Sequence, residues 1–352
     1  MPNTDYLRYL EELRQIPTLS GFENAGQKEV QQLLAPLFDE SRPAGVSGLL
    51  FTKKCSRENA PVLLIDAHLD EIGLIVTDLK DDGTLTVSSL GGMDARTYTA
   101  SSYTIHGKEN MPALSLKKPY CLGGPEARKL PKNGEFWIFT GFTKEELTQK
   151  GVAVGTPVSM ERSTESLSEE QLCGAYMDDK SCAVAALIAL EELKGKDLSC
   201  DICLLLSGQE ESYGAGFRTG VFDACPDEIL VVDVDLGNTP ETDAAKTVKP
   251  GEGPSVAVSV QTDRKMTKEL LRIAREREIP VQPAMNVKST GTNASSAPFL
   301  LGGVPTAVIG LPLKYMHTNV ETFDMHALTE GSRLLAHYLA AMDASWEDEL
   351  WI

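Results

Sequence analysis

Two kinds of apolar spacing alternate along the chain. Apolar positions three and four residues apart indicate amphipathic helices, and short continuous apolar runs indicate buried strands. The predicted helices cover residues 6–15, 24–37, 143–150, 179–193, 215–222, 265–278 and 327–342. The predicted strands cover residues 49–52, 62–67, 74–79, 84–90, 103–106, 113–116, 136–139, 152–160, 202–206, 229–234, 256–260 and 305–309. Outside one central stretch, helices alternate with apolar strands, and this pattern predicts a doubly wound, mostly parallel α/β sheet covered on both faces.

The exception is residues 74–161, where short strands follow one another and glycine, proline and asparagine separate them. The turn Asp81-Asp82-Gly83 joins the first two of these strands as a hairpin. We therefore expect residues 74–161 to form a small all-β barrel domain. It is inserted into a larger α/β domain made from residues 1–73 and 162–352.

Length and charge narrow the class of protein. The chain has 352 residues, enough for two domains. Its net charge of −18 argues against a nucleic-acid-binding protein, which needs a basic face, but permits a cleft that attracts metal ions or amines. Seven cysteines, an odd number, and the lack of a secretory leader predict a reduced, cytoplasmic location. No apolar stretch is long enough to span a bilayer, so no membrane partner is expected.

Candidate chemistry begins where the predicted strand 62–67 runs into His68 and Asp70. In an extended chain these two side chains point the same way, because side chains alternate with a period of two. A neutral imidazole binds a metal through one nitrogen and donates its other N–H to an oxygen acceptor. A carboxylate two residues on can be that acceptor, or can orient a group beside the metal. The pair alone is weak evidence for a metal site, because a half-buried histidine without a metal is the commoner case.

Further metal-ligand residues stand at the ends of predicted elements. Asp178 precedes a helix, Glu210 and Glu211 follow a strand, Asp233 ends another, and His317 follows the last strand. Taken singly, each has an ordinary explanation as a helix cap, a solvated face or a turn residue. Residues after successive strands of a doubly wound sheet converge on one edge, however. The converging set is His68, Asp178, Glu211, Asp233 and His317. Two imidazoles and three carboxylates suit two divalent cations that share a bridging aspartate and a bridging water.

Five motifs carry a family resemblance. In order they read AHLDEIG, MDDK, QEE, VVDV and YMHTNVE. Over nearly its whole length the chain resembles the glutamyl-aminopeptidase/cellulase-M family of dinuclear metalloaminopeptidases, the tetrahedral-aminopeptidase type. The resemblance implies a zinc-aminopeptidase-like sheet with an inserted barrel. It also implies an enzyme that hydrolyses N-terminal residues from short peptides by a water held between two divalent metal ions, either zinc or else cobalt or manganese.

The resemblance also implies which residues hold the metals. His68 and Asp233 would bind one ion, Glu211 and His317 would bind the other, and Asp178 would bridge the two.

Two catalytic roles follow from the same resemblance. Glu210 would be the general base, and Asp70 would orient His68. The wider clan further implies a cis peptide bond between Asp178 and Asp179. We expect Asp178 to touch both metals and Asp179 not to touch them.

Assembly is implied as well, because members of this family commonly form tetrahedral dodecamers. We expect the inserted barrel to mediate self-association into a homodimer, whose two-fold axis fixes two active sites relative to each other. A hollow assembly of twelve subunits would admit short or unfolded peptides and exclude folded proteins.

Three departures from the family pattern bear on substrate preference. Lys180 stands where the family often has arginine, and it keeps only the charge. Asn293, in the run Thr-Gly-Thr-Asn-Ala, stands where the family often has aspartate. Residues 117–120, Lys-Lys-Pro-Tyr, also differ from the usual stretch. The proposed ligands themselves are intact.

Three other functions compete with the aminopeptidase. A two-metal carboxypeptidase or deacylase usually carries its extra domain later in the chain, whereas here it follows Asp70 directly. A glycosidase would use two carboxylates, one on each side of a sugar, and would expose aromatic side chains that bind the sugar. Of the tryptophans, however, only Trp137 lies away from the acidic tail. A catalytically idle scaffold that binds partners would not need Glu210 and all the ligands. Metal binding together with release of N-terminal residues would favour the aminopeptidase.

Overall fold

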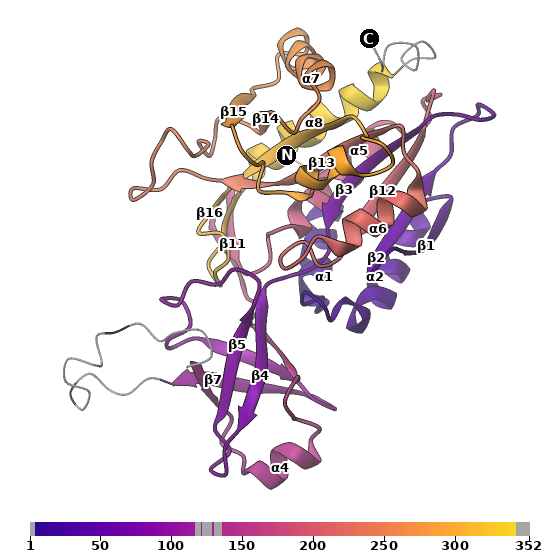
Figure 1. Ribbon diagram of the computed structural model, residues 1–352. Helices are drawn as coiled ribbons and strands as arrows, with labels where there is room; N and C mark the ends of the chain where they lie inside the picture. The colour runs from indigo at the N-terminus through magenta and orange to yellow at the C-terminus, as the bar shows by residue number, and fades with distance from the viewer. Residues whose placement is uncertain (1–3, 117–120, 122–128, 130–135, 343–352) are drawn as a thin grey trace.

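The computed structural model describes residues 4–116, 121, 129 and 136–342, and it combines an eleven-stranded sheet with a closed barrel (Figure 1). From one edge to the other, the strands of the sheet are β1 (Glu40–Ala44), β2 (Gly48–Lys53), β12 (Asp201–Ser207), β3 (Val62–His68), β13 (Glu228–Leu236), β16 (Thr306–Lys314), β17 (Thr322–Asp324), β11 (Gln171–Gly174) and β10 (Thr164–Ser168). Two further strands branch from β16, namely β14 (Ser255–Ser259) and β15 (Gln282–Asn286).

The sheet is parallel at its centre and antiparallel at its flanks. β12, β3, β13 and β16 run parallel to one another, as do β14 and β15. The pairs on either side, from β1 to β12 and from β16 to β10, are antiparallel. The predicted doubly wound α/β sheet with an inserted barrel is confirmed, with parallel pairing confined to these strands. The flanks were missed because strands such as β1 and β10 are mostly exposed and carry no apolar run.

Helices cover both faces of the sheet. They are α1 (Thr4–Gln15), α2 (Gln27–Leu34), α5 (Lys180–Glu192), α6 (Ala215–Ala224), α7 (Arg264–Glu276) and α8 (Met325–Ala341). One apolar core joins α1, α2, α5, α7 and α8 to one face, and another joins α6 and the 3₁₀ helix η4 (Asn293–Phe299) to the other. Residues 180–189 of α5 are buried all round, as expected of a central helix. Within the described ranges, every helix is too short or too polar to cross a lipid bilayer.

Three predicted elements differ clearly in extent, and one is the strand expected over residues 152–160, which forms only as β9 (Pro157–Met160). The helix expected over residues 24–37 is divided into η1 (Glu23–Ala25), α2 and η2 (Ala35–Leu37). Pro36 stops α2, because proline has no N–H to donate and its ring clashes with the preceding turn. The last strand, expected to end at residue 309, continues as β16 to Lys314 because both of its faces are buried.

The barrel occupies the middle of the chain and projects from one end of the α/β part, at the bottom of Figure 1. Around the barrel, the strands are β4 (Gly73–Leu79), β5 (Leu85–Leu90), β8 (Phe136–Phe139), β7 (Asn110–Leu116), β6 (Ser102–His106) and β9 (Pro157–Met160). All six pairs are antiparallel, and the barrel has its own apolar core. The expected helix of this stretch is α4 (Lys144–Gln149), which Thr143 and Glu146 cap. Residues 117–120, one of the three departures, lie outside the described residues.

Candidate metal centre

The carboxyl ends of the parallel strands meet at one edge of the sheet, and the five predicted ligands lie there. His68 is the last residue of β3, and Asp233 lies in the second half of β13. Glu211 follows β12, and His317 follows β16. Asp178 lies just before α5, in the segment that connects β11 to this helix. Ligands of doubly wound sheets bind at this edge, so the fold places the five side chains where a site is expected.

Two groups of possible metal ligands occur among the described residues, and Asp178 belongs to both. The first group is His68, Asp178, Asp179 and Asp233, and the second is Asp178, Glu211 and His317. Within each group the ligand atoms lie within 4.8 Å of one another. The structure therefore brings together all five predicted ligands and adds Asp179.

Asp178 connects the two groups through its two carboxylate oxygens. Its Oδ1 lies 3.0 Å from Nε2 of His68. Its Oδ2 lies 3.3 Å from Nε2 of His317, and Oε1 of Glu211 lies 3.1 Å from the same nitrogen. Each oxygen of Asp178 thus faces a different imidazole, which is the arrangement that a bridging carboxylate requires.

Asp179 was expected to stay away from the metals, yet it lies in the first group. Its Oδ2 accepts a hydrogen bond of 3.1 Å from the main-chain N–H of His68. Its buried Oδ1 has no hydrogen-bond partner within the described part of the chain. The Asp178–Asp179 peptide bond is cis, as the resemblance implied. A buried oxygen without a partner is costly, and a nearby cation would satisfy it.

Main-chain oxygens fix the orientation of both imidazoles. Nδ1 of His68 lies 3.0 Å from the main-chain oxygen of Asp70, and Nδ1 of His317 lies 2.5 Å from that of Gly92. Because a carbonyl oxygen only accepts hydrogen bonds, each Nδ1 donates and each Nε2 is free to bind a metal. Gly92, which follows β5 of the barrel, was not identified from the sequence, since only the fold brings it to His317.

Asp70 acts on the site through two different groups. Its main-chain oxygen holds His68, whereas its carboxylate Oδ1 lies farther from Nδ1 of His68, at 3.6 Å. The carboxylate instead accepts hydrogen bonds from the main-chain N–H groups of Glu210 and Glu211, at 2.9 and 3.1 Å. The fully buried Asp70 side chain therefore positions the Glu210-Glu211 pair, a contact that the sequence reasoning did not include.

Glu210 is the carboxylate left over when the two ligand groups are assigned. It is adjacent to Glu211 and belongs to neither group. Gln209 before it has φ = 59°, so the chain turns sharply after β12, just before the two glutamates. Burial raises the pKa of Glu210 to about 8. A carboxylate that is next in the chain to a candidate ligand, but is not itself a ligand, suits general-base chemistry.

The centre carries an excess of negative charge that fits divalent cations. Burial raises the pKa values of Glu211 and Asp233. Burial alone would lower the pKa of His317, but hydrogen bonds with Asp178 and Glu211 raise it to about 11. Cations would relieve the repulsion among the carboxylates, and carboxylate oxygens with imidazole nitrogens are a donor set that suits zinc, cobalt and manganese. The residues present therefore fit the metal ions that the resemblance implied.

Lys180, the first of the departures, is a buried support. Its Nζ donates to the main-chain oxygen of Leu69 at 2.8 Å and to Oγ1 of Thr18 at 2.5 Å, and lies 3.4 Å from Oε1 of Glu71. The side chain is only 1% exposed, so it does not face substrate. Glu71 also receives two hydrogen bonds from Arg162, at 2.9 and 2.8 Å, where the chain leaves the barrel. Lys180 thus helps to anchor the segment that carries His68.

Asn293, the second departure, is also directed into the protein. Its Nδ2 donates to Oδ2 of Asp66 and to Oγ of Ser207, each at 2.9 Å, and the residue is 4% exposed. An aspartate at this position would place a second carboxylate beside Asp66. The amide of Asn293 therefore gives the buried Asp66 a hydrogen-bond donor in place of a second carboxylate. This contact gives no reason to connect residue 293 with substrate preference.

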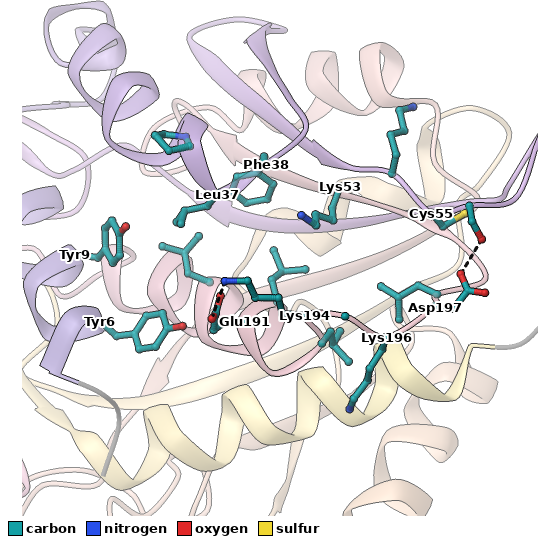
Figure 2. Close-up of a pocket in the computed structure, with 18 of the residues that line it drawn as sticks. Tyr6, Tyr9, Leu37, Phe38, Lys53, Cys55, Glu191, Lys194, Lys196 and Asp197 are labelled. Carbon is teal, nitrogen blue, oxygen red and sulfur yellow. Dashed lines mark hydrogen bonds and ion pairs between the residues drawn. The ribbon is translucent and has the colours of Figure 1, made fainter.

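A cavity of about 570 Å³ lies away from the metal centre, between α1, the end of β2 and the C-terminal half of α5 (Figure 2). Tyr6, Tyr9 and Phe38 line this cavity, as does Lys194, which is paired with Glu191. The metal centre is at the other end of α5, which has 13 residues, about 20 Å at 1.5 Å per residue. None of the candidate ligands is among the side chains that line this cavity.

Known proteins resemble this chain along most of its length. It is 27% identical to the lysyl aminopeptidase of Pyrococcus furiosus, over 90% of this chain and 91% of the relative. It is 25% identical to the glutamyl aminopeptidase of Lactococcus lactis, over 94% of this chain and 95% of the relative.

Solved structures share the fold. An aminopeptidase from Desulfurococcus kamchatkensis matches with a TM-score of 0.91 at 25% identity, covering 99% of this chain and 98% of the other. The TET1 peptidase of Pyrococcus horikoshii, described as able to assemble into a tetrahedron or a large octahedral shell, matches with a TM-score of 0.83 at 22% identity, covering 96% and 100%. The family model of the M42 glutamyl aminopeptidases matches residues 48–334. The chain therefore belongs to the M42 glutamyl aminopeptidase family, as its five motifs predicted, and is a peptide hydrolase of that family.

Proposed function

We propose that this protein is a dinuclear metallo-aminopeptidase that removes N-terminal residues from short peptides. The observation that carries the proposal is the position of Asp178, whose two oxygens face two different imidazoles. A further carboxylate accompanies each imidazole, Asp233 beside His68 and Glu211 beside His317. This is the donor set that two divalent ions sharing one carboxylate would need.

The ligands divide into two sets. His68 and Asp233 would hold one ion, Glu211 and His317 the other, and Asp178 both. Zinc fits this set, with cobalt and manganese as alternatives. When bound, such ions polarise a peptide carbonyl and lower the pKa of coordinated water.

Glu210 is proposed as the general base. The Asp70 carboxylate fixes the main chain of Glu210, so the side chain lies beside the ligand Glu211 without being a ligand itself. From there Glu210 accepts a proton from the attacking water and delivers it to the leaving amine.

The substitution Glu210→Gln tests this assignment. Glutamine keeps the size and the hydrogen bonding but cannot accept the proton, so turnover should fall by about 10²- to 10⁴-fold. Metal content, measured by atomic emission, should remain that of the wild type. Glu211→Gln, one position away, is the matched comparison, because it should lose metal together with activity. Near-normal turnover in Glu210→Gln would contradict the role of the base.

A substrate panel distinguishes the proposed reaction from its relatives. Aminoacyl anilides with free and with acetylated α-amino groups should be assayed with zinc, cobalt and manganese. An aminopeptidase cleaves only the free amines, whereas a deacylase cleaves the acetylated compounds and a carboxypeptidase cleaves neither.

We further propose that the barrel mediates self-association, with a dimer as the unit and a dodecamer as the complete assembly. Leu114 on β7 pairs with Phe139 on β8, and these residues are 55% and 39% exposed. Trp137, two residues before Phe139, is 52% exposed on the same outer face. Such an apolar patch on a small barrel suits an interface, and the similar TET1 peptidase assembles into shells.

A further inference from the structure

Glu321 is a buried acid next to the metal centre that the assignments above leave without a role. It lies between β16 and β17 and is 1% exposed. Its Oε2 accepts hydrogen bonds from the main-chain N–H groups of Met177 and Asp178, at 2.8 and 3.3 Å. Its Oε1 accepts another from the main-chain N–H of His317, at 2.8 Å. One carboxylate therefore holds three amides of two separate segments.

Each of these segments contains a candidate metal ligand and a residue whose main chain is in the left-handed region. Tyr176, two residues before Asp178, has φ = 66°, and His317 itself has φ = 64°. Residues with a side chain rarely adopt this left-handed region, because Cβ approaches the main chain too closely. Hydrogen bonds from the adjacent amides to Glu321 hold both segments in this form. The main-chain oxygen of Glu321 also accepts from Gly174 at 2.9 Å, which joins its own segment to β11.

Glu321 is not itself placed as a ligand. Both of its oxygens already accept N–H groups, and it belongs to neither group of possible ligands. Its position is equivalent to that of Asp70, which accepts from the amides of Glu210 and Glu211 on the other side of the centre. Two buried carboxylates thus hold the backbone of three of the segments that form the site.

We propose that Glu321 is a positioning residue of the metal centre, one that holds Asp178 and His317 at the separation required to bind metal. The inference rests on the proposed function, because it concerns residues assigned there as ligands. A carboxylate is needed for this task, since it offers acceptors on both oxygens. A glutamine offers one acceptor oxygen, and its NH₂ group would face an N–H donor of one segment.

The test compares Glu321→Gln with wild-type protein of full length, by competition for zinc with a chromophoric chelator. We expect zinc affinity to fall roughly 10- to 100-fold, the range usual for groups that orient metal ligands. The visible absorption of bound cobalt, which reports ligand geometry, should change as well. Glu228→Gln is the matched control, because Glu228 is also buried but bonds to Tyr338, away from the centre. It should bind zinc like the wild type.

The outcomes separate the two proposals. If wild-type protein binds zinc and Glu321→Gln binds it with the same affinity and cobalt spectrum, the positioning role is wrong and the proposed function stands. If the wild type binds no divalent cation, both are overturned. Should Glu321→Gln fail to fold, amide hydrogen exchange of the metal-free wild type decides. The amides of Met177, Asp178 and His317 should be protected, and exchange at the rate of an open loop would overturn the proposal.

Discussion

Replacing Glu71 by glutamine tests what anchors the barrel beside the metal centre. Glu71 is completely buried where the chain enters the barrel, and Arg162, where the chain returns, donates two hydrogen bonds to it. Lys180, which is 1% exposed, is its second cationic neighbour at 3.4 Å. Glu71→Gln keeps the shape of the side chain but leaves two cations without their counter-charge.

The magnitude follows from the burial of this cluster. Removing one partner of a buried ion pair costs about 3–5 kcal/mol, because the other charge stays buried without compensation. With two cations affected, we expect the upper part of that range for Glu71→Gln. The control is Glu191→Gln. Glu191 and its partner Lys194 have side chains that are 52% and 75% exposed, so this change should cost no more than about 1 kcal/mol.

The assay is urea unfolding followed by circular dichroism, in buffer with a chelator so that metal binding does not add to stability. A double-mutant cycle with Lys180→Met isolates the electrostatic part. The double variant should be more stable than the sum of the two single losses predicts, by about 1–3 kcal/mol. A loss in Glu71→Gln as small as that in Glu191→Gln, or strictly additive losses in the cycle, would refute the reasoning.

Three further predictions concern other parts of the molecule. Asn293→Asp replaces the amide that donates to Asp66 at 2.9 Å by a second carboxylate, so the free energy of unfolding should fall by at least about 2 kcal/mol. Adding Asp66→Asn to this variant should recover most of the loss, and no recovery would contradict the pairing of residues 66 and 293. Burial raises the pKa of Glu228 from 4.5 to about 7, so its contribution to stability is complete below pH 4.5 and is lost as the pH rises through 7. At 1.4 kcal/mol per pH unit this amounts to about 3.5 kcal/mol. The melting temperature of Glu228→Gln should therefore change less between pH 5 and 8 than that of the wild type, and an equal change in both proteins would contradict this prediction. Trp137→Ser with Phe139→Ser should reduce the mass measured by light scattering at micromolar protein, and an unchanged oligomer would show that the barrel patch is not the interface.

The sequence predicted those parts of the site that depend on the ends of secondary-structure elements. His68, Asp233 and His317 follow apolar runs that are long enough to identify as strands, and parallel strands bring their ends to one edge. The barrel was equally recognisable from its short strands and turns. These features are encoded locally, so local patterns are sufficient to find them. The cytoplasmic location stays a prediction.

The remaining features depend on contacts between residues far apart in the chain. Gly92 reaches His317, and Glu321 reaches Met177, only through the packing of the barrel and the sheet. Lys180 and Asn293 were expected to bear on substrate preference, but both side chains are buried against acidic partners. Main-chain hydrogen bonds leave no signature in the residue pattern, and the identity of a buried neighbour cannot be read from spacing.

The measurement that tests the central claim most directly is the metal content of the purified chain, taken together with its rate of N-terminal residue release. Wild-type protein loaded with zinc and then dialysed should retain two ions per chain, one for each ligand group, and should release the N-terminal residue of a short peptide. Asp178→Asn, which alters the one carboxylate common to both groups, should lose zinc and this activity together. A wild type that retains one ion or none, or an Asp178→Asn variant that keeps both ions and full activity, would contradict a dinuclear aminopeptidase.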